Sequence, residues 1–477
     1  MGRRILAAVA ALILISGVAF GAADYEADWA SLDARPVPGW FTDAKFGIFI
    51  HWGLYSVPAW SQKGKYSEWY WYWMNLPGSP EALFHAKVYG ENFAYQDFAP
   101  MFRAELFDPA EWAGILEGSG AKYVVLTSKH HDGFCLWPSE YSWNWNSGDA
   151  GPHRDLAGDL SRSVKSRGLK MGFYYSLYEW YNPMYVQPAK DAVSTMMQYT
   201  KKGKKKKKRD PEAQMKEYVE KHMLPQLREL VTAYKPSMIW TDGEWDYPSG
   251  VWQSEKFLAW LFSKSPVADE IVVNDRWGSG TRGVHGGFHT TEYGDLDEFE
   301  KKRKAGHPWE ECRGIGASFG YNRNESLNEY KSAAELIHML VDIVSFGGNL
   351  LLDIGPTADG RIPVIMQQRL SEIGNWLAVN GEAIYGTRPW RTATDGEYVR
   401  YTSRDGAVYA ISMKWPGPKL ELAEPKPGGD VVVTIPGVEQ PLTSRFENGR
   451  LIIDVPALTI DRLPAQHAFV FKITGIK

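Results

Sequence analysis

Polar and titratable side chains follow several short apolar runs of this 477-residue chain. Imidazole, carboxyl, phenol and guanidinium groups can transfer protons, attack an electrophile or bind hydroxyl groups. They occur as His51 after residues 46–50, His130 and His131 after 123–126, Tyr174 and then Glu179 after 171–173, Asp242 after 238–240, and Arg276 after 271–273. If these segments end at one place, they indicate a polar pocket of the size of a sugar.

The apolar runs themselves predict the strands that would bring these side chains together. They lie at residues 46–50, 123–126, 171–175, 238–240, 271–273 and 350–354. Helical patterns such as 212–234 and 333–344 lie between several of them. Continuous apolar strands separated by helices are typical of a parallel sheet that is buried on both faces. We therefore expect an α/β fold with a (β/α)8-like barrel, whose catalytic groups stand at the carboxyl ends of the strands.

The pattern changes after about residue 390. Short strand-like runs separated by Gly/Pro turns occur at 399–403, 407–413, 430–435, 451–455 and 468–473. They predict a small antiparallel β-domain, most simply a sandwich. We expect a signal peptide at residues 1–23, a catalytic barrel at 24–388 and a C-terminal β-sandwich at 389–477.

The first residues have the order of a secretory signal peptide. Arg3 and Arg4 precede an apolar run at 5–20, and small residues follow at 21–23. The run is shorter than the roughly 20 apolar residues that a membrane span needs, so we expect secretion and no membrane span. An uncleaved anchor is the alternative, and periplasm, extracellular medium and lysosome all stay open as compartments.

Composition narrows the class of partner. The formal net charge of -4 and the 23% of charged residues are ordinary for a globular protein. The 14% of aromatic residues suits sugar binding, although large cores also use aromatic rings.

The run at 201–209 is basic at every position but Gly203. Because like charges at this density repel, we interpret it as a solvated loop and expect no nucleic-acid partner. Self-association and the pairing of Cys135 with Cys312 stay open.

Each candidate has a simpler interpretation when it is taken alone. His51 could be a half-buried histidine of the core, and Asp242 with Gly243 could form only a turn. His130 and His131 could bind a metal, but neighbours on an ideal strand face opposite ways and no second cluster completes three ligands. We therefore expect neither a metal nor a cofactor.

Eight segments taken together resemble glycoside hydrolase family 29, the α-L-fucosidases. They are FGIFIHWG (46–53), SEWY (67–70), KHHDGFCLW (129–137), GPHRDL (151–156), IWTDGEW (239–245), VVNDRWG (272–278), GIGASFGYN (314–322) and GNLLLDIGPTADG (348–360). YSLYEW (175–180), HGGF (285–288) and NGEAIYGTRPWR (380–391) are similar to its lysosomal-type branch. The similarity runs from about Trp40 to the C-terminus in matching order.

The resemblance implies a retaining mechanism without a metal, in which Asp242 is the nucleophile and Glu292 the acid/base. It further implies fucose-binding roles for His51, Glu68, Trp69, His130, His131, Tyr174 and Arg276, and a contact between Phe319 and the methyl face of the sugar. The expected partner is a fucosylated glycan.

Two questions stay open after the resemblance. The segments 283–287 and 294–303 look like variable loops, and Glu310 is a rival proton donor to Glu292, which we favour for its Thr and Tyr neighbours. The same pocket could also serve an α-L-galactoside, or a catalytically inactive protein could use it to bind fucose.

Overall fold

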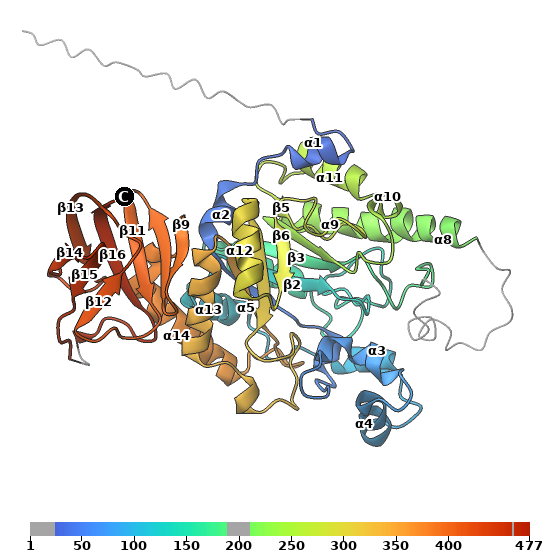
Figure 1. Ribbon diagram of the computed structural model, residues 1–477. Coiled ribbons are helices and arrows are strands. Elements are labelled where there is room, and N and C mark those ends of the chain that lie inside the picture. The colour runs from blue at the N-terminus through green and yellow to red at the C-terminus, as the bar shows by residue number, and fades with distance from the viewer. Residues whose placement is uncertain (1–23, 188–209, 460–461) are drawn as a thin grey trace, which may run out of the picture.

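Eight parallel strands form the central sheet of the protein (Figure 1). The computed structural model describes residues 24–187, 210–459 and 462–477, so the predicted signal peptide and the basic run at 201–209 lie outside it. The strands are β1 (Phe46–Ile50), β2 (Tyr123–Lys129), β3 (Lys170–Ser176), β4 (Met238–Asp242), β5 (Val272–Val273), β6 (His289–Glu292), β7 (Trp309–Gly314) and β8 (Asn349–Ile354). Their order is β5-β4-β3-β2-β1-β8-β7-β6. The predicted (β/α)8-like fold is confirmed, although no ladder of hydrogen bonds joins β5 to β6 among the described residues.

Strand β1 shows why the sequence forms such a sheet. All five of its residues are buried, because helices cover one face and the barrel interior covers the other. Ile48 and Ile50 belong to the core between sheet and helices, whereas Phe49 belongs to an interior cluster with Tyr174 and Trp240. Aromatic side chains thus fill the barrel below the strand ends.

Helices surround the sheet and connect its strands (Figure 1). They are α1 (Trp29–Asp33), α2 (Gly39–Ala44), α3 (Tyr70–Met74), α4 (Pro80–Val88), α5 (Pro109–Gly118), α6 (Leu156–Ser166), α8 (Pro211–Tyr218), α9 (Leu224–Tyr234), α10 (Ser249–Trp252), α11 (Ser254–Ser263), α12 (Leu296–Ala305), α13 (Ala333–Ser345) and α14 (Val364–Asn380). Short 3-10 segments include η1 (Leu54–Ser56), η2 (Ser67–Trp69), η3 (Tyr95–Met101), η5 (Leu327–Glu329) and η6 (Gly381–Ala383), and the π-helix η4 (Val219–Met223) joins α8 to α9. None of the helices in the described residues is both long and apolar enough to span a bilayer.

Three elements differ from the sequence prediction. Strands β6 and β7 were not among the predicted strands. Their sequences contain no continuous apolar run, because polar side chains of both strands face partners inside the barrel. The predicted loop at 294–303 is wrong, since α12 occupies most of it. The Asp295 side chain caps the first turn of α12, and Gly306 ends the helix with a φ of 71°.

The C-terminal region folds into two antiparallel sheets around their own core, as predicted. One sheet contains β9 (Arg388–Asp395), β10 (Val399–Arg404), β11 (Ala407–Ser412), β13 (Pro427–Thr434) and β16 (Phe469–Ile476), and the other contains β12 (Lys419–Leu422), β14 (Ser444–Glu447) and β15 (Arg450–Asp454). Helix α13 packs against β9 and β10, and Arg400 pairs with Asp342 of that helix at 2.5 Å. Figure 1 shows these sheets beside α13 and α14.

Candidate active site

A cavity of about 350 Å³ opens at the carboxyl ends of the barrel strands. It is lined by the predicted residues His51, Glu68, Trp69, His130, His131, Tyr174, Asp242, Arg276, Glu292 and Phe319, and also by Phe49, Tyr66, Trp73, Trp240, Trp245, Arg282 and Cys312. Segments that are far apart in the sequence therefore converge on one pocket. Glu310 and Glu179 are not among its lining residues.

Asp242 is the last residue of β4 and points into this cavity. Gly243 follows with a φ of 74°, and a Cβ atom there would collide with Tyr178, so the turn after the carboxylate needs glycine. The Tyr174 hydroxyl donates to Asp242 Oδ2 at 3.0 Å, and Arg276 Nη1 donates to Oδ1 at 2.8 Å. Both carboxylate oxygens therefore have a donor.

The charge on Asp242 is stabilised by its neighbours. Burial by itself would raise the pKa of this carboxyl. The positive charges of Arg276 and Arg282, together with that of His131 when its imidazole is protonated, outweigh burial and lower the pKa to about 2. Asp242 is thus an anion at any ordinary working pH, which is the form that a nucleophile needs.

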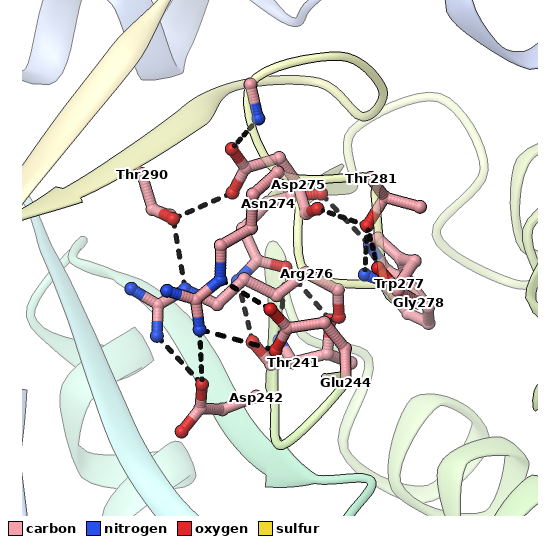
Figure 2. Close-up of polar contacts among 12 residues, drawn as sticks. Thr241, Asp242, Glu244, Asn274, Asp275, Arg276, Trp277, Gly278, Thr281 and Thr290 are labelled. Carbon is pink, nitrogen blue, oxygen red and sulfur yellow. Dashed lines mark hydrogen bonds and ion pairs between the residues drawn. The ribbon is translucent and has the colours of Figure 1, made fainter. Parts of the chain in front are cut away.

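Arg276 links the two carboxylates of the cavity. Its Nη2 donates to Glu292 Oε1 at 2.5 Å, while Nη1 holds Asp242. Its Nε donates to Thr290 at 3.0 Å, and its guanidinium lies 4.3 Å from the centre of the Trp240 ring. Figure 2 shows this side chain between Thr290 and Asp242. A single guanidinium fixed on several sides therefore sets the positions of both acids.

The strand pair β4 and β5 is held in register by one asparagine (Figure 2). Asn274 Oδ1 accepts from the backbone N of Thr241 at 3.1 Å, and its Nδ2 donates to the Thr241 carbonyl at 2.8 Å. Because β5 has only two residues, these side-chain bonds replace part of a ladder beside Asp242.

Three buried histidines line the cavity close to Asp242. His51 Nδ1 lies 2.6 Å from Asp353 Oδ1, and His131 Nδ1 lies 2.6 Å from the Ser176 hydroxyl. Burial lowers the pKa of His51 to about 3 and that of His131 to about 4. His130 Nδ1 has no hydrogen-bond partner in the described part of the chain. Neutral imidazoles of this kind can exchange hydrogen bonds with sugar hydroxyls in either direction.

Glu68 and Phe319 also line the cavity, on the side of His51. Glu68 Oε2 accepts from the backbone N of Gly320 at 2.9 Å, and burial raises the pKa of this carboxyl to about 7. The Phe319 ring stacks on His51, with centroids 5.0 Å apart and an interplanar angle of 25°. Phe319 thus offers an apolar face beside polar groups.

The register of β6 and β7 separates the two candidate acids. Glu292 pairs with Cys312, whereas Glu310 pairs with Thr290, which is two residues farther from the open end of the barrel. The Glu292 side chain is 33% exposed, while Glu310 is 1% exposed. Glu310 accepts from Tyr123 at 2.5 Å and from Trp240 at 2.9 Å, and burial raises its pKa to about 7.

A buried charged network supports the histidines from behind. Lys129 Nζ lies 2.6 Å from Glu179 Oε2, and His222 Nε2 lies 3.1 Å from the same oxygen. The next residue along the chain, Trp180, donates its backbone N–H to the His131 carbonyl at 2.8 Å. The network therefore anchors the segment that carries His131.

Several residues in or next to the cavity were missed from the sequence, and one of them, Asp353, contacts the lining residue His51. Asp353 ends an apolar run just as Asp242 does, so its place at a strand end could have found it. Trp245 stands three residues after Asp242, but one more tryptophan carries little signal. Arg282 lies in a segment without strand or helix pattern, and nothing in the sequence places it beside Asp242, which it contacts at 3.4 Å.

The described residues contain no group of three or more His, Cys, Asp or Glu side chains placed to hold a metal ion. His130 and His131 both line the cavity, since β2 ends at Lys129 and the alternation of a strand no longer applies. Cys135 and Cys312 are both buried and free.

Comparison with known families agrees with this geometry. A family model described as alpha-L-fucosidase matches residues 12–382, and one described as alpha-L-fucosidase C-terminal domain matches residues 393–474. The chain belongs to the α-L-fucosidase family. It is 43% identical to the tissue alpha-L-fucosidase of Homo sapiens over 95% of this chain and 92% of the relative. An alpha-L-fucosidase of Dictyostelium discoideum is also 43% identical, over 95% of this chain and 96% of the relative.

Solved α-L-fucosidase structures share the fold. The Thermotoga maritima alpha-fucosidase in complex with a mechanism-based inhibitor superposes with a TM-score of 0.79 and 36% identity, over 94% of this chain and all of that one. A GH29 alpha-L-fucosidase from Bacteroides thetaiotaomicron gives a TM-score of 0.74 at 25% identity, over 92% of this chain and 96% of that one. The predicted family, barrel and glycoside hydrolase activity on fucosylated glycans are thereby confirmed.

Proposed function

We propose that Asp242 is the nucleophile and Glu292 the general acid/base of this retaining, exo-acting α-L-fucosidase. The observation that carries the proposal is the Arg276 bridge, which holds both carboxylates in one cavity. Retaining glycosidases place such a pair about 5–5.5 Å apart, and we expect that separation in a site occupied by fucose.

In the first step Asp242 attacks the anomeric carbon while Glu292 gives its proton to the departing oxygen. One carbon–oxygen bond forms to Asp242 and one breaks to the leaving sugar. The ion pair between Arg276 and Glu292 requires a carboxylate, whereas proton donation requires the acid. Arg276 therefore has to release Glu292 when substrate binds, and it keeps its bond to Asp242.

In the second step Glu292 acts as a base. Its carboxylate takes a proton from water, the water oxygen attacks the anomeric carbon, and the ester to Asp242 breaks. The product is fucose with its original anomeric configuration. Arg276 can pair with Glu292 again in this step, since the carboxylate is now the active form.

The remaining lining residues would bind the sugar. We propose that His51, Glu68, Trp69, His130, His131, Tyr174 and Arg276 hold its hydroxyls, and that Phe319 packs on its methyl group. Neutral imidazoles beside a carboxyl with a raised pKa, as at Glu68, supply both donors and acceptors. The stacking of Phe319 on His51 supports an apolar wall at this side.

An aryl glycoside panel tests the function. We expect turnover of an aryl α-L-fucoside with retention, slow turnover of the α-L-galactoside, and none of unrelated glycosides. An equal rate on the galactoside would favour the alternative sugar. Binding of fucose without turnover of any fucoside would favour the inactive-protein alternative.

We further propose that residues 1–23 direct secretion and that a domain boundary lies between residues 388 and 389. The order of basic, apolar and small residues supports the leader, and the start of β9 at Arg388 supports the boundary. N-terminal sequencing of the secreted protein tests the first. Self-association stays a prediction that light scattering of the purified protein tests.

A further inference from the structure

Three tryptophans form a row along one wall of the cavity. Trp69 and Trp245 lie with ring centroids 6.4 Å apart and an interplanar angle of 24°. Trp69 and Trp73 lie 6.3 Å apart at 37°. All three line the cavity, and they come from η2, α3 and the segment after β4. The row therefore runs from Trp245, three residues after Asp242, through Trp69 to Trp73 of α3.

The side chain of Trp245 is far more exposed to solvent than the tryptophans of the core. One side of its indole packs against His131, with centroids 5.6 Å apart, and against Tyr178 at 5.5 Å, yet the residue remains 40% exposed. Exposed aromatic surface costs free energy in water, so a ligand that covers this face of the indole gains that free energy on binding. Trp143 is even more exposed, at 82%, but does not line the cavity.

Polar groups at the same wall complete the chemistry of a sugar site. The Tyr174 hydroxyl and the three histidines lie on the inner side of this wall, and the buried Nε1 of Trp73 does not open on the cavity. The Arg282 side chain is 44% exposed and lines the cavity, and Glu244 holds its guanidinium in place. A pyranose ring has an apolar C–H face and a rim of hydroxyls, so it can stack on an indole while its rim meets such donors.

We propose that Trp245 forms a subsite for the sugar to which fucose is attached, next to Trp69, which the proposed function places against fucose. This inference rests on the proposed function, because it assumes that fucose occupies the inner part of the cavity against Asp242. The occupant is a pyranose with an open C–H face. Trp245 would then determine which fucosides are preferred, without taking part in bond breaking.

The test compares a substrate that fills the subsite with one that does not. The first is the fucosyl disaccharide that the wild type hydrolyses fastest, and the second is α-L-fucosyl fluoride, whose leaving group is a single atom. In Trp245→Ala, the ratio of kcat/KM for the disaccharide to kcat/KM for the fluoride should fall about two- to tenfold, the range of one aromatic contact. Trp245→Phe should restore most of the ratio, and Trp143→Ala should not change it.

The two substrates also separate the inference from the function on which it rests. The wild-type rate on the fluoride tests the fucosidase activity by itself and does not involve the subsite. Equal losses on both substrates in Trp245→Ala would overturn the inference, because Trp245 would then belong to the fucose subsite. An unchanged ratio with no loss on either substrate would overturn it as well, since the indole would touch no part of the leaving sugar.

Discussion

Arg276 donates from Nη1 to Asp242 Oδ1 at 2.8 Å, and its backbone carbonyl accepts from the hydroxyl of Thr241, the residue before Asp242, at 2.6 Å. Arg276 follows β5, the shortest strand of the sheet, and Asp242 ends β4. The bond joins the ends of these two strands (Figure 2). The charge state of Asp242 therefore depends on a residue that follows the neighbouring strand.

Removal of the nucleophile should abolish turnover. In Asp242→Ala, kcat should fall by roughly 10³-fold or more on activated and natural substrates, because no covalent intermediate can form. Azide should restore activity and give the fucosyl azide of inverted configuration, as measured by NMR. Asp405→Ala, whose side chain is 84% exposed, is the matched control and should behave as the wild type. A folded Asp242→Ala protein with near-normal activity would exclude Asp242 from the mechanism.

Glu292→Gln and Glu310→Gln should differ in their dependence on the leaving group. Loss of a general acid costs about 10²–10⁴-fold when the leaving group needs a proton and little when it does not. We expect this dependence in Glu292→Gln only, measured as kcat/KM across aryl fucosides of graded leaving-group acidity. The same dependence in Glu310→Gln alone would transfer the acid/base role to Glu310.

The acid limb of the pH profile should respond to Arg276. Burial raises the pKa of Asp242, and the charge of Arg276 is the largest influence that lowers it to about 2. Because the nucleophile must be ionised, activity is lost as the pH falls through this pKa. Arg276→Gln should raise the pKa and move the acid limb of kcat/KM to higher pH. Arg282, at 3.4 Å from Asp242, is the weaker neighbour, and Arg282→Gln should move it less. An acid limb that stays in place in Arg276→Gln would contradict this account.

The buried pair of Lys129 and Glu179 should matter for stability. Glu179→Gln leaves the buried Lys129 ammonium without its anion, which costs about 3–5 kcal/mol of unfolding free energy. Burial raises the pKa of Glu179, but Lys129 and His222 lower it to about 2. Its contribution is therefore present above the pKa of the unfolded chain and is lost as the pH falls toward 2.

Urea unfolding at neutral and acidic pH measures this effect. The exposed pair of Glu329 with Lys63 offers a control, because water screens it, and Glu329→Gln should change the midpoint little. Equal midpoints for Glu179→Gln and the wild type would show that the buried network does not stabilise the fold.

Phe319 should set the preference for the methyl group of fucose. An apolar wall rejects an added hydroxyl by roughly 10²-fold, so the wild type should prefer α-L-fucosides over α-L-galactosides by about that factor. Phe319→Ala should shrink the ratio of the two kcat/KM values and leave azide rescue of Asp242→Ala intact. Equal kcat/KM for the two sugars in the wild type would exclude an apolar wall as the source of specificity.

The sequence by itself determined the fold class and predicted that Asp242 stands at the end of a barrel strand. Strands buried on both faces are largely apolar, so β1 to β5 and β8 could be recognised as runs, and the first polar groups after them mark the open end of the barrel. Asp242 stands at such a point, and Gly243 supplies the turn that only glycine can make there. These are local properties, and they can be read residue by residue.

The tertiary structure alone decided which second carboxylate faces the cavity. Glu292 and Glu310 lie on neighbouring strands without apolar runs, and neither has a local feature that fixes its depth. The parallel register pairs Glu310 with Thr290 and Glu292 with Cys312, so Glu310 is buried against Tyr123 and Trp240 while Glu292 reaches Arg276. Register depends on how β6 and β7 meet across the chain that separates them. Since that pairing is set by packing over the whole barrel, no short stretch of sequence contains it.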